Sequence, residues 1–369
     1  MNKQLKIIIA GGGTGGHVFP AIAIANAIKH LDTNVQILFI GAQDRLEMEK
    51  VPQAGFQIVG LPIKGLKRSF TLQNIKTIFL LFKSIAKTKK VYKDFRPQVV
   101  IGVGGYASAP ALHVAVRKKI PIVLQEQNSY PGITNRMFGK YAYRICSAYE
   151  EVKKYFPEEK VIITGNPVMD TIVNANIEKV QGLSYFGLDS NKKTLLITGG
   201  SLGARQLNKA VIEHLDLLRE ANINLIWQTG RIYYESIKKQ VKEESWLKIV
   251  PFIENMLYAY CASDLVVSRA GAITISELNI LGKAVIFVPS PNVAEDHQKK
   301  NALALVKHNA AIMIEDENAP HELIPKAISL LLDSKKIAEL EKNIKKFAKP
   351  YAANEIAKII LEIAKTNKK

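Results

Sequence analysis

The sequence lacks the features that mark several large classes of protein. It has only two cysteines, Cys146 and Cys261, which are too few for a disulfide scaffold and indicate a reducing compartment. Its longest apolar run, at residues 78–82, ends at Lys83 and is far shorter than the roughly 18 residues that a membrane-spanning helix needs. The apolar stretch at residues 7–10 is too short for the core of a secretion signal, so we expect none.

Motifs of metal-dependent chemistry are also missing. The sequence has no Asp-x-Asp pair of the kind that holds a divalent ion on a diphosphate, no H-E-x-x-H and no C-x-x-C. The phosphate-binding motif G-x-x-x-x-G-K-[ST] of kinases and ATPases is missing too. We therefore expect no metal and no cofactor. Any diphosphate that leaves during a reaction is expected to be neutralised by helix N-termini and hydroxyl groups.

Acidic residues are scarce relative to basic ones. The chain has 33 Asp and Glu against 51 Lys and Arg, and residues 1–165 alone hold 24 basic side chains against 10 acidic ones. This half is expected to face an anionic partner, such as a phosphate-bearing substrate or a membrane surface, although a solubilising surface has the same composition. Basic residues interleaved with aromatics on an exposed sheet are missing, so we expect no nucleic-acid partner.

Short apolar runs alternate with longer helical patterns along the 369 residues, which are enough for about two domains. The runs are rich in Val, Ile and Leu, as in parallel strands that are buried on both faces. Strands are expected at residues 5–10, 35–40, 57–60, 98–103, 121–125 and 144–147, and again at 194–198, 224–228, 247–250, 265–267, 284–288 and 311–314. This alternation of strands and helices predicts two α/β, Rossmann-like, doubly wound domains.

The two sets of strands are separated by a break at Gly165-Asn166-Pro167. We therefore predict an N-terminal domain at residues 1–165 and a second domain at 166–349. Residues 350–369 are predicted to contain a final amphipathic helix, which begins after Pro350.

Four glycine-rich turns follow predicted strands, two in each half of the chain. They lie at residues 11–17, 104–110, 199–205 and 268–274. Glycine permits close backbone approach, and a following helix offers free N–H groups, so such turns are suited to phosphate groups. The first turn matches G-x-G-x-x-G, but only Asp44 follows the second strand, beyond its end at Gly41. A dinucleotide site has its acidic residue at that strand end, so we do not expect NAD.

Six stretches of the sequence resemble the MurG family of bacterial glycosyltransferases, in the same order and over essentially the whole chain. They are residues 11–17, 102–106, 126–128, 165–168, 200–205 and 268–277. The resemblance implies a GT-B fold, in which two Rossmann-like domains face each other across a cleft. It also implies that the final helix packs back on the N-terminal domain.

The resemblance implies an inverting, metal-independent hexosyltransferase of peptidoglycan synthesis, a process tied to cell shape and division. GlcNAc would pass from UDP-GlcNAc to the C4 hydroxyl of undecaprenyl-diphosphate-linked muramyl-pentapeptide. The enzyme would be peripheral at the cytoplasmic face of the inner membrane, near other cell-wall synthesis proteins. A GT-B transferase that acts on a different lipid or aglycone is the alternative.

Inversion requires a base on the acceptor hydroxyl and stabilisation of the departing UDP. His17 follows the first glycine turn at a helix start and is our candidate base, because histidine exchanges protons near neutral pH. A role in positioning the turn or binding phosphate is its alternative. Glu126 is the rival base, and it could instead orient Asn128 or His17.

The resemblance also implies the substrate contacts. Donor binding is assigned to Thr14, Gly15, Gly16, Asn128, Ser201, Leu202, Gly203, Phe252, Ile253, Ala272, Ile273, Thr274, Glu277 and Gln298. The acceptor diphosphate is assigned to Gly13, Gly104, Gly105, Tyr106 and Ser108.

Three of these donor contacts have specific roles and ordinary alternatives. The two oxygens of Glu277 would accept both ribose hydroxyls, although an exposed helical acid is its plain alternative. The backbone at Phe252 would read uracil, although core packing explains a phenylalanine there equally well. Ser201 and the amides that follow it would hold the UDP phosphates.

One position departs from the family pattern. The family usually has arginine after the motif G-N-P-V, whereas this chain has Met169. A charge partner for the substrate phosphate is therefore missing from that position. Arg205, one turn into the next helix, or a nearby lysine is a candidate replacement, and packing or ion pairing is the alternative role of Arg205.

The segment 71–93 is predicted to be a helix with an apolar stripe and many lysines around it. Such a stripe is usually part of the core. Aromatic residues beside dense lysine also fit a face that lies on a membrane without crossing it. The residues predicted to touch the membrane are Ile75, Ile78, Phe79 and Phe82.

Overall fold

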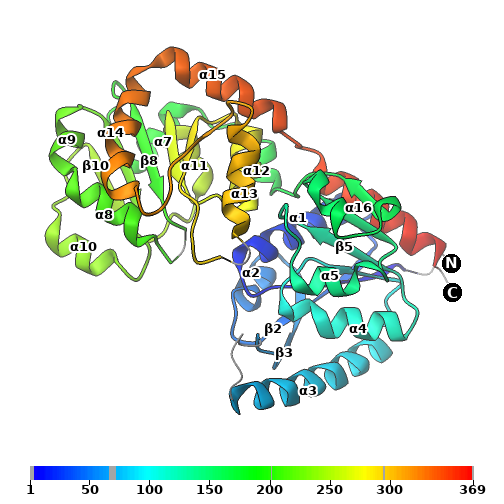
Figure 1. Cartoon of the computed structure of the whole chain (residues 1–369). Helices are drawn as coiled ribbons and strands as arrows, with labels where there is room; N and C mark the ends of the chain where they lie inside the picture. The colour runs from blue at the N-terminus through cyan, green and yellow to red at the C-terminus, as the bar shows by residue number, and fades with distance from the viewer. Residues whose placement is uncertain (1–3, 66–71, 201, 294–295, 368–369) are drawn as a thin grey trace. The chain divides into compact units, whose positions relative to one another are not determined.

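The computed structural model describes residues 4–65, 72–200, 202–293 and 296–367. It divides the chain into two compact units (Figure 1). The first comprises Met1–Met169 and Lys349–Lys369, and the second comprises Asp170–Ala348. The chain thus enters the second unit just after the break that the sequence predicts at Gly165.

The described part of the first unit contains a parallel sheet of seven strands. The strands are β1 (Lys6–Ala10), β2 (Gln36–Ala42), β3 (Gln57–Leu61), β4 (Val99–Gly102), β5 (Ile122–Glu126), β6 (Arg144–Ser147) and β7 (Val161–Ile163). Their order in the sheet is β3-β2-β1-β4-β5-β6-β7. The chain therefore winds from β1 in both directions, as in a doubly wound fold.

Side chains of one strand alternate between two separate cores, because successive residues point to opposite faces of the sheet. Ile7 and Ile9 of β1 belong to one core, and Ile8 and Ala10 to the other. Helices α1 (Gly15–Leu31), α2 (Glu47–Gln53) and α16 (Ala352–Thr366) contribute to the first core. Helices α3 (Leu72–Phe95), α4 (Ala109–Arg117) and α5 (Ile133–Gly139) contribute to the second (Figure 1). Short 3₁₀ helices lie at η1 (Tyr106–Ser108), η2 (Glu150–Lys154) and η3 (Glu158–Lys160).

The final helix, α16, completes the first unit although its sequence is remote from it. Ile356 and Ile360, one turn apart, are fully buried in the same core as Ile24 and Ile28 of α1. Spacing of four residues places such side chains on one face of a helix. The first core is therefore closed by residues from both ends of the chain.

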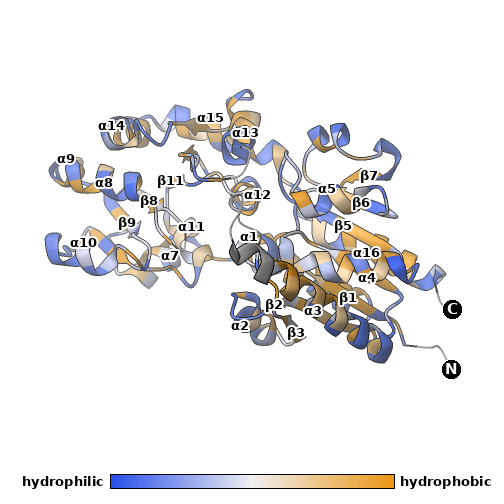
Figure 2. Cartoon of the chain, turned by 60° about the horizontal axis from the view of Figure 1, so that its bottom comes forward, coloured by the Kyte–Doolittle hydropathy of each residue, from blue (hydrophilic) through white to orange (hydrophobic). Residues whose placement is uncertain are grey.

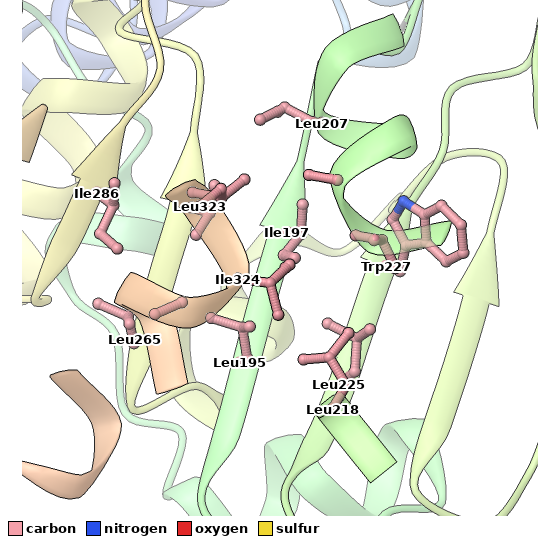
Figure 3. Packing of buried hydrophobic residues seen from close by; sticks show 14 of the residues in the cluster. Leu195, Ile197, Leu207, Leu218, Leu225, Trp227, Leu265, Ile286, Leu323 and Ile324 are labelled. Carbon is pink, nitrogen blue, oxygen red and sulfur yellow. The ribbon is translucent and has the colours of Figure 1, made fainter. Parts of the chain in front are cut away.

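The second unit repeats this architecture with a parallel sheet of six strands in its described part. They are β8 (Thr194–Thr198), β9 (Asn224–Gln228), β10 (Leu247–Val250), β11 (Leu265–Ser268), β12 (Val285–Phe287) and β13 (Ile312–Met313), in the order β10-β9-β8-β11-β12-β13. The helices are α6 (Asp170–Val173), α7 (Lys179–Phe186), α8 (Arg205–Glu213), α9 (Leu215–Glu220), α10 (Tyr234–Gln240), α11 (Met256–Ala262), α12 (Ala272–Leu281), α13 (His297–Val306), α14 (Ala319–Leu332), α15 (Ser334–Ile344) and η5 (Lys345–Phe347). Figure 3 shows one face of the sheet, where Leu195 and Trp227 pack with Leu323 of α14.

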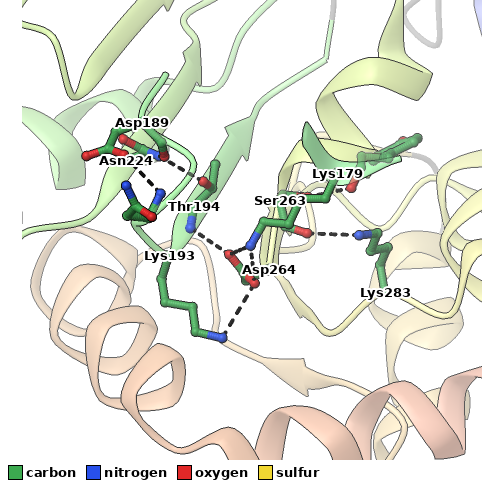
Figure 4. A network of polar contacts seen from close by, with 10 residues as sticks. Lys179, Asp189, Lys193, Thr194, Asn224, Ser263, Asp264 and Lys283 are labelled. Carbon is green, nitrogen blue, oxygen red and sulfur yellow. Dashed lines mark hydrogen bonds and ion pairs between the residues drawn. The ribbon is translucent and has the colours of Figure 1, made fainter. Parts of the chain in front are cut away.

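A polar network ties together the amino ends of β8 and β11 (Figure 4). Asp264 accepts hydrogen bonds from Lys179 Nζ at 2.6 and 2.7 Å and from the backbone N–H of Thr194 at 2.8 Å. Lys283 Nζ donates to the carbonyl of Ser263 at 2.9 Å. This end of the sheet lies opposite the carboxyl ends, where ligands bind in open α/β sheets, so we assign the network a structural role.

The strands predicted from the sequence are all found, with ends that differ by at most two residues. One strand, β7, is missing from the prediction, because Val161, Ile162 and Ile163 form too short a run to distinguish from a loop. It is paired with β6 at the edge of the sheet and is only half-buried.

We predict that Ile360→Ala lowers the free energy of unfolding of the first unit by about 2–5 kcal/mol, because it leaves a cavity under α1. Far-UV circular dichroism in urea measures this loss. Both tryptophans, Trp227 and Trp246, belong to the second unit, so their fluorescence follows that unit separately. The control is Lys358→Ala on the exposed face of α16. Equal effects of the two substitutions would contradict the packing described.

Candidate functional site

The four glycine turns predicted from the sequence follow the four strands at which the two sheets change winding direction. In the first unit, β1 and β4 are neighbours that lead to opposite sides of the sheet. In the second unit, β8 and β11 have the same relation. Open α/β sheets bind ligands at such a switch point, outside the carboxyl ends of the strands. The topology therefore marks one candidate site in each unit.

The carboxylate of Glu47 supports the first glycine turn through hydrogen bonds. Glu47 Oε2 accepts the backbone N–H of Gly13 at 2.9 Å, and its Oε1 accepts that of Ala42 at 2.9 Å. The N–H of Gly13 is therefore already used inside the protein. The predicted contact of Gly13 with the acceptor diphosphate stays a prediction, and it has to be made without this N–H, which points toward a carboxylate.

His17 lies in the first turn of α1, which begins at Gly15 and Gly16 with Thr14 as its N-cap residue. Its Nδ1 shares a hydrogen bond with Thr14 Oγ1 at 3.0 Å. The other edge of the ring faces the second turn: a Cβ placed on Gly104 would lie 2.9 Å from His17 Nε2. The two turns of the first unit thus meet at this imidazole.

The second turn passes into η1 through two glycines with positive φ, +93° at Gly104 and +75° at Gly105. The Tyr106 ring covers Gly13. Ser108 is fully buried, and its hydroxyl donates to the carbonyl of Gly105 at 2.8 Å. The Ser108 side chain therefore lies inside the turn, and its predicted contact with a diphosphate stays a prediction.

Glu126 ends β5 and is almost completely buried. Its Oε1 accepts the backbone N–H of Asn128 at 3.1 Å, and its Oε2 accepts Gly132 N–H at 3.1 Å and Asn135 Nδ2 at 2.9 Å. Burial raises the pKa of Glu126, while these donors lower it. Both oxygens are occupied by the loop that follows β5. These contacts agree with the alternative role of Glu126, the orientation of Asn128, and its role as a base stays a prediction.

The Gly165-Asn166-Pro167 motif is part of a buried amide network. Asn166 Nδ2 donates to the carbonyl of Gln127 at 3.0 Å, and Asn166 Oδ1 accepts from Gln125 Nε2 at 3.2 Å. Met169, which stands where the family usually has arginine, packs against the core that contains α16. This position is therefore apolar in the present chain.

In the second unit, the turn after β8 is closed by its own backbone. Gly203 N–H donates to the carbonyl of Gly200 at 2.9 Å, so this amide already has a partner within the protein. The predicted contact of Gly203 with the donor stays a prediction. Gly203 has φ of +79° and packs against the carbonyl of Thr229. Leu202 is exposed, and Ser201 lies outside the described residues.

The turns after β9 and β10 border the same end of the sheet. Gly230 packs on Gly203, and the next residue, Arg231, places its guanidinium over the ring of Phe252 at 5.4 Å from the centroid. Phe252 is half-buried and Ile253 is buried. A cation therefore lies beside Phe252, where the contact with uracil is predicted. The replacements predicted from the sequence were Arg205, which begins α8 and is exposed, and a nearby lysine.

The turn after β11 leads into α12, whose first residues are Ala272, Ile273 and Thr274. The turn is anchored by Arg269, which donates to Asp316 Oδ1 at 2.5 Å and to the carbonyl of Val288 at 3.0 Å. The beginning of α12 is therefore fixed from two sides.

Glu277 lies one turn further along α12, in a half-buried position. The hydroxyl of Tyr260, which is almost fully buried in α11, donates to Glu277 Oε2 at 3.0 Å. Burial raises the pKa of Glu277 to about 7, and the bond from Tyr260 partly opposes that rise. Gln298, at the start of α13, uses its Oε1 to accept the N–H of Ser290 at 2.8 Å.

Helix α3 buries two small hydroxyl side chains and exposes two phenylalanines. Ser84 and Thr88 are fully buried, and their hydroxyls donate to helix carbonyls one turn earlier. Phe79 and Phe82 are 68% and 66% exposed. Figure 2, coloured by hydropathy, shows that part of α3 consists of hydrophobic residues. Ile78 is exposed as well, whereas Ile85, at the far end of the predicted stripe, packs against the core. The side chain of Ile75 lies outside the described residues.

Five lysines surround this face of α3. All are exposed: Lys83, Lys87, Lys89, Lys90 and Lys93. In the part of the chain that the structure describes, no helix is long and apolar enough to cross a membrane.

Three residues of these sites were not predicted from the sequence: Glu47, Arg231 and Tyr260. Glu47 lies three residues past Asp44, in the region where we looked for a ribose-binding acid. Arg231 directly follows Gly230, which comes shortly after the buried strand β9. A glycine in that place could have indicated a further turn at the site. Tyr260 had no local signal, since its partner is seventeen residues away.

Two family models match the chain. The Glycosyltransferase family 28 N-terminal domain matches residues 7–147, and the Glycosyltransferase family 28 C-terminal domain matches residues 194–356. Together they cover most of the sequence.

Curated relatives are similar over nearly their whole length. A protein of Parabacteroides distasonis is 48% identical over 363 residues, which cover 98% of this chain and 99% of the relative. One from Flavobacterium psychrophilum is 48% identical over 366 residues, 99% of this chain and all of the relative. Both are named UDP-N-acetylglucosamine--N-acetylmuramyl-(pentapeptide) pyrophosphoryl-undecaprenol N-acetylglucosamine transferase.

Among solved structures, MurG of Acinetobacter baumannii matches with a TM-score of 0.74 and 27% identity, over 97% of this chain and 99% of that one. A UDP-GlcNAc 2-epimerase of Neisseria meningitidis matches with a TM-score of 0.66 at 16% identity, and shares the fold alone. The predicted GT-B fold is confirmed. The chain belongs to glycosyltransferase family 28 and, within that family, to the MurG group.

Proposed function

We propose that this chain transfers N-acetylglucosamine from UDP-GlcNAc to the N-acetylmuramyl-(pentapeptide) pyrophosphoryl-undecaprenol acceptor named for its relatives. The observation that carries the proposal is the placement of the four glycine turns at the two switch points. One switch point carries a histidine and the other a carboxylate suited to ribose. This division fits acceptor activation in the first unit and donor binding in the second.

The donor would bind at the carboxyl ends of β8 and β11. The diphosphate would lie at the start of α8, where the amide of Leu202 and the positive end of the helix favour negative charge. The ribose hydroxyls would donate to Glu277, which Tyr260 holds in place. Arg231, in the second unit, supplies a positive charge near the leaving group. The position of the family arginine, Met169, is the last residue of this part of the first unit and carries no charge.

The acceptor would react beside His17. Nε2 would take the proton of the acceptor hydroxyl while that oxygen attacks C1 of GlcNAc. The bond from C1 to the UDP oxygen breaks, and UDP leaves on the opposite face, which inverts C1. For Nε2 to accept a proton, Nδ1 must carry the hydrogen and donate it to Thr14 Oγ1, 3.0 Å away. The hydroxyl oxygen of Thr14 can accept this hydrogen, so the contact is compatible with the tautomer that works as a base.

The lipid part of the acceptor would be reached from a membrane surface. Phe79 and Phe82 project from α3 among exposed lysines, as in proteins that rest on a membrane. Each lysine near anionic lipid contributes about 1 kcal/mol, which salt screens. We propose reversible, peripheral binding through this face.

We predict that His17→Ala lowers kcat for GlcNAc transfer by about 10²–10⁴-fold, because the acceptor hydroxyl loses its base. Transfer from labelled UDP-GlcNAc to a polyprenyl-diphosphate muramyl acceptor measures this, with and without EDTA. Activity in EDTA is expected to be unchanged. An effect of His17→Ala on KM alone would contradict a base, and GlcNAc transfer only to another acceptor would contradict the proposed reaction.

The affinity for UDP-GlcNAc is predicted to rise as the pH increases from about 6 to about 8. Glu277 has its pKa raised to about 7, so its carboxylate, which accepts both ribose hydroxyls, forms only above that pH. Calorimetric titration of UDP-GlcNAc measures the dependence. In Tyr260→Phe the midpoint should move to higher pH, because a bond that lowers the pKa of Glu277 is lost.

The matched control for this dependence is Glu277→Gln, which keeps the shape and cannot ionise. It should bind UDP-GlcNAc about tenfold more weakly at high pH and show little pH dependence. If it kept the same pH dependence as the unmodified chain, Glu277 would not be the group that titrates.

The chain is predicted to sediment with vesicles that contain an anionic lipid at low salt, and to be released at high salt. Replacing both Phe79 and Phe82 by serine should weaken this binding, since two exposed rings no longer enter the interface. Leu332→Ser, on α14 of the second unit, removes a side chain that is 74% exposed and serves as the control. Failure to bind vesicles at low salt would exclude the proposed face.

A further inference from the structure

The first unit contains a buried acidic side chain that no step of the proposed reaction uses. Glu47 is the first residue of α2, yet only 1% of its surface is exposed. Its carboxylate turns away from solvent and lies under the first glycine turn. Burial of a carboxylate is unfavourable unless hydrogen-bond donors compensate it, so this placement requires an explanation.

The donors are backbone amides from two different segments. Gly13 N–H lies 2.9 Å from Glu47 Oε2 and 3.1 Å from Oε1, and Ala42 N–H lies 2.9 Å from Oε1. Gly13 belongs to the turn after β1, and Ala42 is the last residue of β2. The side chain therefore joins the turn to the end of the neighbouring strand.

The surrounding glycines fit this side chain closely. A Cβ on Gly12 would lie 2.1 Å from Glu47 Oε1, and one on Gly41 would lie 2.6 Å from Glu47 Cγ. Gly12 also has φ of +143°. The glycines thus make room for the carboxylate as well as shaping the turn.

A short series of contacts leads from Glu47 to the imidazole. The carbonyl of Gly12 lies against Gly105, where a Cβ would approach it to 2.4 Å. Gly13 is followed by Thr14, which shares a hydrogen bond with His17. A displacement of residues 12–13 therefore moves the ring that lies between the two turns.

The negative charge of the Glu47 carboxylate also indicates whether the first glycine turn binds an anion. A carboxylate that accepts the N–H of Gly13 opposes the binding of an anion at the same amide, because like charges repel. A turn dedicated to phosphate would leave that amide free. The arrangement is suited to holding a side chain in a fixed position.

We propose that Glu47 is a positioning residue for the transfer reaction: it holds the turn at residues 12–14 so that His17 Nε2 faces the acceptor hydroxyl. The inference rests on the proposed role of His17. Glu47 itself contacts neither substrate.

The test compares Glu47→Gln with Glu49→Gln, a control on the same helix whose side chain is 61% exposed. Glutamine keeps the shape, but it places an NH₂ group against one of the two amides. We expect kcat to fall about tenfold to a hundredfold, since a small misplacement of the base is enough for such a loss. The KM for UDP-GlcNAc and its calorimetric Kd should stay within about twofold, and Glu49→Gln should behave as the unmodified chain.

An unchanged kcat in folded Glu47→Gln would overturn the proposal. So would a parallel loss of kcat, donor affinity and melting temperature, which indicates a general structural role. If Glu47→Gln does not fold, Glu47→Asp keeps the charge but is too short to reach both amides, and it should show the same selective loss of kcat. Measuring His17→Ala in the same assay separates the two claims. Full activity of His17→Ala would refute the role of His17 as the base. If His17→Ala loses activity while Glu47→Gln keeps it, only the positioning role of Glu47 is refuted.

Discussion

Close contact between backbone segments at the carboxyl ends of the strands is the constraint on which both sites depend. In the first unit the carbonyl of Gly12 meets Gly105, and in the second the carbonyl of Thr229 meets Gly203. At each contact a side chain would overlap a backbone oxygen, and Gly105 and Gly203 have positive φ. The same solution thus appears in two units with different sequences. It brings neighbouring turns together and fixes where the adjacent functional side chains point.

The two units differ in the group that accepts the N–H of a turn glycine. The N–H groups of Gly13 and Gly203 are satisfied inside the protein, by a carboxylate in one case and by the carbonyl of Gly200 in the other. Glycine in a turn therefore does not by itself identify a phosphate donor. In the first unit the result is a rigid support for His17. In the second unit, the groups left to bind the diphosphate are the start of α8 and the guanidinium of Arg231.

Apolar runs and glycine turns made most of the fold predictable, because fully buried parallel strands leave an unbroken pattern of Val, Ile and Leu. The short edge strand β7 has no such pattern and was missed. Side-chain direction was not predictable: Ser108 turns inward, Glu126 is enclosed by its own loop, and Glu47 points under the first turn. These orientations depend on segments far apart in the sequence. The exposure of Phe79 and Phe82 agrees with the face predicted for this helix, but hydropathy alone did not indicate that Ser84 and Thr88 face the core.

The central claim is that the second unit holds the nucleotide while the glycine turns of the first hold the base. The structure of the chain with UDP bound tests it most directly. The account predicts the diphosphate at the turn after β8, with both ribose hydroxyls within hydrogen-bond distance of Glu277. A diphosphate seated on the amides of residues 11–16, with Glu277 remote from the ribose, would contradict it.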